Sequence, residues 1–146
     1  MIEEAAPSSQ LEVGMPIYLQ SVDAIRAICA DRIYGLRRPQ RGDPDDQLPA
    51  IMITRTQTTT QKLFCGTDGL WQAEVQVDCF AMGASVFKLA KAVKRALVDF
   101  SGMMGETDVD EVTLINEFPV DDPDPGVERV TQVYQIFYAE DLSDDD

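Results

Sequence analysis

The sequence contains no histidine, few cysteines and no long apolar run, and each absence excludes a class of protein. Without histidine there is no Ser-His-Asp or Cys-His nucleophilic site, no imidazole base and no histidine metal ligand. No apolar segment approaches the roughly 20 residues that a membrane helix needs, and the acidic start is not that of a signal peptide. Neither membrane insertion nor histidine-based catalysis is therefore expected.

The three cysteines, Cys29, Cys65 and Cys79, are widely spaced and form no CxxC pair. A zinc ribbon or a thioredoxin-type motif consequently has no support. Free thiols in a reducing compartment are expected, and a Cys65–Cys79 disulfide is the open alternative.

Basic residues are scarce: 12 Lys and Arg stand against 26 Asp and Glu, which gives a net charge of −14 in 146 residues. This sign argues against general affinity for nucleic acids, because phosphate binding needs Lys and Arg to displace counterions. The length suits one domain, and the 45% hydrophobic fraction is that of an ordinary globular protein.

The charge is unevenly distributed along the chain. Residues 1–98 hold 11 basic and 11 acidic residues, whereas residues 99–146 hold 15 acidic residues and a single basic one, Arg129. Such charges often form a solvated surface, but a subunit with a basic part and an acidic part can also associate head to tail and close a ring. Two clusters contain most of the basic residues: Arg32, Arg37, Arg38 and Arg41, and Lys88, Lys91, Lys94 and Arg95.

Hydrophobic periodicity predicts the helices. Residues 11–29 are expected to form two helical pieces broken near Gly14 and Pro16, with Ser21 as N-cap of the second. Residues 84–100 form the clearest helix, with Gly102 as a C-terminal cap. Its apolar stripe contains Val86, Ala90, Val93 and Leu97, joined by Phe87 and Phe100.

Strands are predicted at residues 51–60, 71–79, 109–118 and 127–138, after a short extended segment from residue 31. Residues 71–79 alternate between apolar and polar side chains, and Asp78 on the polar face is expected to be a cross-strand or capping partner. The first two long strands suggest an antiparallel hairpin. The last strand is apolar on both sides in its second half, which indicates a central position or a partner subunit.

These elements predict an α+β fold in which helices pack on one face of a mostly antiparallel sheet, in the order α-β-β-β-α-β-β. We expect a flexible arm at residues 1–10, one domain over residues 11–140 and an acidic tail at residues 141–146.

No pattern selects a catalytic, cofactor or metal site. The acidic loop at residues 121–128 lacks the closing Glu of a calcium loop, and the Gly-Thr-Asp-Gly run at residues 66–69 lacks the Lys of a phosphate-binding loop. Carboxylates at residues 108, 110 and 111 could bind a metal, but adjacent carboxylates are more often solvated. A small enzyme with a carboxylate-bound metal remains an alternative that a metal assay would test.

Five segments, in this order and spacing, resemble the tail completion, or tail terminator, family of long-tailed bacteriophages and related particles. They are residues 31–34 (Asp-Arg-Ile-Tyr), 48–53 (Leu-Pro-Ala-Ile-Met-Ile), 75–81 (Val-Gln-Val-Asp-Cys-Phe-Ala), 90–97 (Ala-Lys-Ala-Val-Lys-Arg-Ala-Leu) and 134–138 (Tyr-Gln-Ile-Phe-Tyr). The resemblance covers about residues 11–140, and the long acidic ending departs from the family pattern.

The resemblance implies a non-enzymatic virion protein that needs no cofactor and assembles in the host cytoplasm. Six copies would form a ring at the head-proximal end of the tail tube. The ring would stop tube polymerisation and contact the tube protein and the head-tail connector or stopper, and DNA would pass through its lumen without specific binding. A head-tail adaptor or stopper of the neck is the alternative reading.

Charge suggests how such a ring would use its surfaces. Basic residues would contact acidic residues of a neighbouring subunit or partner: Arg32, Arg37, Arg38, Arg41, Lys88, Lys91 and Arg95. Acidic residues would line or rim the lumen, where negative charge lowers affinity for DNA phosphates. The candidates are Asp108, Asp110, Glu111, Asp121, Asp122 and Asp124.

Overall fold

The structure, a computed structural model, describes residues 11–30, 32–35, 48–61, 70–105, 107–121 and 126–139. The elements follow in the order α1 (Leu11–Gln20), α2 (Asp23–Cys29), β1 (Ile33–Tyr34), β2 (Ala50–Gln61), β3 (Leu70–Met82), α4 (Ser85–Leu97), β4 (Gly102–Met104), β5 (Thr107–Asp121) and β6 (Val127–Ala139). The predicted order is confirmed, with the first helical region in two pieces and the short β4 added before β5.

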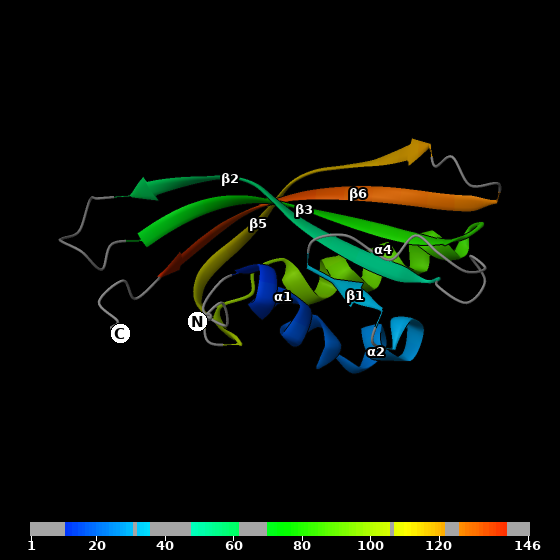
Figure 1. The fold of residues 1–146 in the computed structure, drawn as a ribbon, viewed down its shortest axis with the longest axis horizontal. Coiled ribbons are helices and arrows are strands. Elements are labelled where there is room, and N and C mark those ends of the chain that lie inside the picture. The colour runs from blue at the N-terminus through cyan, green and yellow to red at the C-terminus, as the bar shows by residue number, and fades with distance from the viewer. Residues whose placement is uncertain are drawn as a thin grey trace, which may run out of the picture.

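The strands form one curled sheet in the order β1-β2-β3-β6-β5-β4. The short β1 pairs with β2 in parallel, and every other neighbouring pair is antiparallel. The predicted hairpin of β2 and β3 is therefore confirmed, as is the central position of β6 between β3 and β5. All the labelled helices lie on one face of the sheet (Figure 1). None of the described helices is long and apolar enough to span a membrane.

The main core lies between the helices and the sheet. Alternate side chains of β3, including Val75 and Val77, are buried against it, as the alternating pattern predicts. From α4 the stripe of Val86, Val93 and Leu97 is buried in the same core. Each such side chain stabilises the fold by roughly 1.5–3 kcal/mol relative to an exposed position.

The predicted break in the first helix is wrong in its position. Helix α1 continues through Gly14 and Pro16 and ends at Gln20. Gly14 lies directly against the backbone carbonyl of Met104 in β4, so its lack of a side chain serves packing. Ser21 is not the N-cap of α2: Val22 takes that position without a side-chain bond, and the Ser21 hydroxyl donates to the Tyr18 carbonyl at 2.5 Å.

Two predictions for α4 are also wrong. The helix ends at Leu97 with Val98 as its C-cap, and Gly102 begins β4. Asp99, with φ of 64°, takes the left-handed conformation that the glycine was expected to provide. Phe87 is 61% exposed, because it follows Val86 by one residue and so turns about 100° away from the buried stripe.

The two described cysteines, Cys29 and Cys79, are buried free thiols. The alternative prediction of a Cys65–Cys79 disulfide is therefore wrong, because Cys79 is a free thiol. Cys65 itself lies outside the described residues. Burial raises the pKa of the Cys29 thiol to about 12, although the nearby charge of Arg32 acts in the opposite direction. Such buried thiols are poor nucleophiles. The predicted arm at residues 1–10 and tail at residues 141–146 also lie outside the described part of the chain.

Candidate interaction surface

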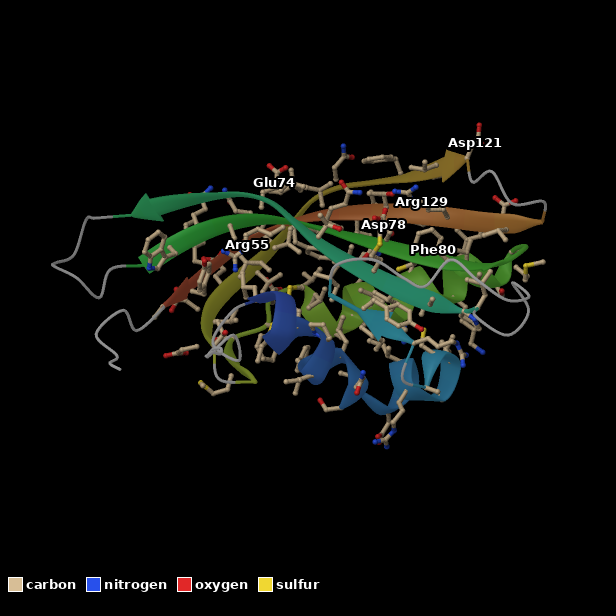
Figure 2. The ribbon with its side chains drawn as sticks, viewed as in Figure 1. Arg55, Glu74, Asp78, Phe80, Asp121 and Arg129 are labelled. Atoms are coloured by element: carbon tan, nitrogen blue, oxygen red, sulfur yellow. The ribbon has the colours of Figure 1, made fainter. Side chains whose placement is uncertain are left out.

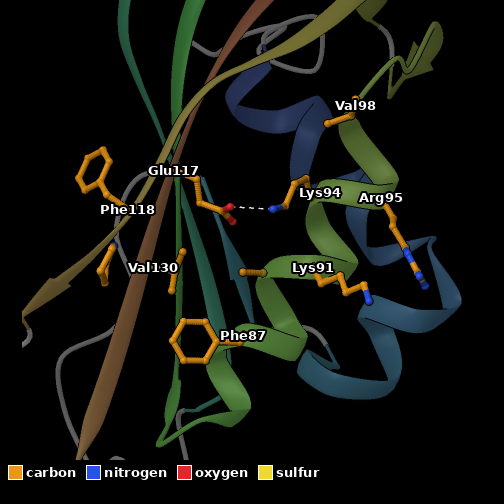
Figure 3. Close-up of a pocket in the computed structure, with 10 residues that line it drawn as sticks. Phe87, Lys91, Lys94, Arg95, Val98, Glu117, Phe118 and Val130 are labelled. Atoms are coloured by element: carbon orange, nitrogen blue, oxygen red, sulfur yellow. Dashed lines mark hydrogen bonds and ion pairs between the residues drawn. The ribbon is translucent and has the colours of Figure 1, made fainter.

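A groove of about 700 Å³ lies between α4 and the second half of β5, and we call it the α4/β5 groove. It is mostly apolar, with a few charged side chains along it (Figure 3). The apolar lining consists of Phe87, Ala90, Val98, Phe118, Pro119 and Val130, and the charged lining of Lys91, Lys94, Arg95 and Glu117.

Large apolar side chains are exposed on several elements, and three of them line the groove. Of the seven that are exposed in the described residues, five belong to α4, β4, β5 or the residue after α4. They are Phe87, Val98, Met103, Ile115 and Phe118. Phe87, Val98 and Phe118 line the groove, and exposed apolar residues beside a groove with charged residues around them are typical of a surface that contacts another protein.

A chain of polar contacts fixes the middle of the groove. Lys94 Nζ lies 2.6 Å from Glu117 Oε1, and Gln132 Nε2 donates to Glu117 Oε2 at 2.9 Å. Gln132 also donates to the Ala90 carbonyl, and its own Oε1 accepts from the Tyr134 hydroxyl at 2.7 Å. These contacts tie α4, β5 and β6 together at the middle of the groove.

The Lys94–Glu117 pair has an electrostatic consequence for the carboxyl group. Partial burial acts to raise the pKa of Glu117, but the hydrogen bonds from Lys94 and Gln132 and the charge of Lys94 outweigh it. The pKa of Glu117 is therefore below its ordinary value. Glu117 is ionised near neutral pH, and the ammonium of Lys94 is already paired within the chain.

The outer face of α4 is basic. Lys88, Lys91 and Arg95 are exposed, and the helix contains no acidic residue. Lys91 and Arg95 line both the α4/β5 groove and a second hollow between α2 and α4, whereas Lys88 lines the second hollow alone. The structure thus brings three of the predicted contact residues to one surface.

The other basic cluster is only partly described. Arg32 is half-buried, and its guanidinium donates to the carbonyls of Pro49 at 2.8 Å and Ile28 at 3.4 Å. Arg32 therefore holds the end of α2 against the start of β2. The remaining predicted contact residues, Arg37, Arg38 and Arg41, lie outside the described residues.

The predicted acidic group is divided between the two ends of β5. Asp108, Asp110 and Glu111 are exposed near its start, and Asp121 is exposed at its end. Thirteen residues of strand separate the first and last of these, which corresponds to roughly 44 Å. Asp122 and Asp124 follow Asp121 and lie outside the described residues.

Asp78 forms a second polar centre on the opposite face of the sheet (Figure 2). Its carboxylate accepts from Thr131 Oγ1 at 2.5 Å, Arg129 Nε at 3.2 Å and Gln76 Nε2 at 3.0 Å. The prediction of a cross-strand partner is confirmed, because Asp78 and Thr131 are paired residues of β3 and β6. The prediction that the polar face of this strand is solvated is wrong at Asp78, because Asp78 is fully buried beside Phe80 and Arg129.

Metal binding finds no support in the described part of the chain, where no three His, Cys, Asp or Glu side chains are placed to share an ion. Sequence reasoning also did not identify Val98, Glu117 or Phe118 as parts of one surface. Their association depends on the register of β5 against β6 and on the bulge after Leu114, which local sequence patterns do not encode.

Comparison with known proteins gives a family and a fold. The sequence model of the family described as tail completion protein gp17 matches residues 18–139. No curated protein matches. Among solved structures, a chain of the "Virion of native gene transfer agent (GTA) particle" has a TM-score of 0.66 at 12% identity, and the match covers 93% of this chain and 99% of that one. At this identity the second match is a likeness of fold.

Proposed function

Because the chain belongs to the tail completion protein gp17 family, we propose that six copies form a ring at the head-proximal end of a tail tube. In this role the ring ends tube polymerisation, joins the tail to the head, and lets DNA pass through its lumen. The observation that carries the proposal is the family match over residues 18–139. The likeness in fold to a chain of a gene transfer agent virion supports a place in such a particle.

The surfaces described above suit a structural protein that works through contacts. A basic face on α4 and the excess of acidic residues after residue 98 give each copy two regions of opposite charge. A contact between unlike surfaces is heterologous, and such contacts close into a ring when the rotation between copies allows it. In this ring Lys88, Lys91 and Arg95 contact a neighbour, together with Arg37, Arg38 and Arg41.

The proposed lumen uses the two acidic groups of β5. If β5 runs along the ring axis, Asp108, Asp110 and Glu111 lie toward one opening and Asp121, Asp122 and Asp124 toward the other. Carboxylates at both openings lower the affinity for DNA phosphates, so DNA passes without being held. The tube protein and the head-tail connector or stopper are the proposed neighbours along the axis.

Imaging of particles from a strain that lacks this protein tests the proposal. We expect tails of uncontrolled length beside filled heads that are not joined to tails. Complementation with the wild-type chain should restore joined particles of uniform tail length. Normal, joined particles in the deletion strain would exclude the proposed role.

A charge reversal at Arg37 and Arg38 tests the basic contact separately. The variant with Arg37→Glu and Arg38→Glu should complement the deletion strain poorly and yield fewer joined particles. Intact ring assembly and tail joining in this variant would remove these two arginines from the interface and leave the terminator role unaffected.

A further inference from the structure

We infer that the α4/β5 groove binds the acidic C-terminal segment, residues 140–146, of a neighbouring copy. The inference rests on the ring proposed above, because it needs two adjacent copies. It assigns to this groove an occupant with two properties, an apolar side chain and several carboxylates, and the chain itself supplies a segment with both.

The groove and the segment are complementary in charge and in polarity. The segment reads Glu-Asp-Leu-Ser-Asp-Asp-Asp, with five carboxylates around a single apolar residue, Leu142. On the groove side, Phe87 and Val130 provide an apolar end, and Lys91 and Arg95 also line the groove, with their side chains directed toward α2 and away from β5 (Figure 3). Within the described residues Lys91 and Arg95 form no ion pair, whereas Lys94 is bound to Glu117. Two cations of the groove are thus available for carboxylates of a partner.

The outer edge of β5 is unsuited to binding the segment as an added strand. Pro119 has no N–H group, and the Glu117 N–H donates to the Asn116 side chain at 2.9 Å. A bulge between Leu114 and Asn116 further disturbs the ladder along this edge. The occupant is therefore held by its side chains, with Leu142 against Phe87 and carboxylates against Lys91 and Arg95.

The geometry of β6 places this contact between copies. The segment follows Ala139, whereas Val130, which lines the groove, lies nine residues earlier on the same strand. Nine residues of strand span about 30 Å. Leu142 is three residues beyond Ala139 and reaches only about 10 Å from it. Leu142 therefore cannot reach the Phe87 end of its own groove, but it can enter that of a neighbour.

Disulfide trapping in assembled particles tests the contact. A chain with Phe87→Cys and Leu142→Cys, incorporated into particles and oxidised with diamide, should yield linked multimers on a non-reducing gel. The matched control combines Leu142→Cys with Ile17→Cys, because Ile17 is an exposed apolar residue of α1 on another surface. We expect at least tenfold more multimer from the Phe87 pair than from the Ile17 pair.

Charge swapping tests the ionic part of the contact. In the chain that already carries Phe87→Cys and Leu142→Cys, the further changes Lys91→Glu and Arg95→Glu should lower the multimer yield at least tenfold. Adding Asp144→Lys, Asp145→Lys and Asp146→Lys to that chain should restore the yield. Arg26→Glu is the control, because Arg26 is an exposed basic residue of α2 that lines neither the α4/β5 groove nor the second hollow.

The possible failures have different meanings. If a lysine-reactive crosslinker shows rings in the particles but the Phe87 pair links no better than the Ile17 pair, the docking is wrong and the ring stands. In a chain that also carries Cys65→Ser, multimers from Phe87→Cys alone would mean that two grooves face each other, which also overturns the docking. If the particles contain only single copies, the proposed ring itself fails.

Discussion

Asp78 has the largest predicted effect on stability at the scale of single residues. Its carboxylate is fully buried and accepts from Arg129, Thr131 and Gln76. Removing one member of a buried charge pair leaves the other without compensation, which typically costs about 3–5 kcal/mol. Arg129 retains some access to water, so Asp78→Ala should lower the free energy of unfolding by about 3 kcal/mol in urea denaturation.

The exposed Asp110 provides the control for this measurement. Asp110→Ala removes a carboxylate at a solvated position of β5 and should change the free energy of unfolding by less than about 0.5 kcal/mol. Equal effects of the two substitutions would show that the buried contacts of Asp78 contribute nothing specific to the fold.

The lowered pKa of Glu117 predicts that the stability of the protein depends on pH. Folding lowers its pKa below the ordinary value of 4.5, so the unfolded chain binds its proton more readily than the folded chain. The stabilisation by Glu117 is complete above the pKa that its carboxyl has in the unfolded chain. It is lost as the pH falls through the lower pKa of the folded chain. At pH 7, Glu117→Gln should lower the free energy of unfolding by about 1 kcal/mol, because the pair with Lys94 is partly exposed.

Urea denaturation of both proteins between pH 7 and pH 3 measures this contribution. The difference between wild type and Glu117→Gln should be constant down to about pH 5 and should shrink below that, because protonated Glu117 resembles the amide. Taking the difference removes the titration of the other carboxylates. A difference that grows on acidification would contradict the lowered pKa.

At the scale of elements, Gly14 controls how α1 packs on β4. In an exposed helix, replacement of glycine by alanine stabilises by about 1 kcal/mol. Here the new Cβ would collide with the Met104 carbonyl, which is backbone and cannot rotate away. Gly14→Ala should therefore lower the free energy of unfolding by about 2 kcal/mol, in the range typical of overpacking. An increase in the melting temperature would contradict this packing.

The type of each long element could be predicted from the sequence, whereas element ends could not. Alternation over β3 and the stripe of Val86, Val93 and Leu97 on α4 reflect burial against one core, so local patterns reveal them. The close packing of Gly14 in α1 against a carbonyl of β4 joins residues that are distant in sequence, so local patterns do not reveal it. The cap of α4 likewise depends on Asp99, whose N–H donates to the Val112 carbonyl of β5.

The candidate surface could also be predicted only in part from the sequence. The basic face of α4 follows from its helical spacing, and the structure confirms that Lys88, Lys91 and Arg95 are exposed together. The groove beside it was not predictable, because Glu117 reaches Lys94 only through the register of β5 and β6 and the helix packed beneath them. The exposure of Phe87 was missed because an apolar residue next to the stripe was assigned to the core.

At the scale of the whole molecule, the net charge of −14 has a direct consequence for contact with DNA. The proposed ring surrounds DNA without binding it. Replacing the carboxylates that face the lumen by lysines should therefore make the ring bind DNA. A triple variant with Asp108→Lys, Asp110→Lys and Glu111→Lys should retain linear DNA on the assembled ring at about 50 mM salt. Retention should fall steeply as salt rises, because each phosphate contact releases condensed counterions.

The position of the new lysines, not their number, should decide the outcome. The control variant carries three lysines on the exposed side of α2, at Asp23, Ala24 and Ala27. If the start of β5 faces the lumen, the β5 variant retains DNA in a gel-shift titration and releases its genome more slowly from particles, whereas the α2 variant behaves as wild type in genome release. Equal DNA retention by both variants, with normal genome release, would place the β5 carboxylates outside the lumen. Such a result would leave the proposed ring and its role in tail joining unaffected.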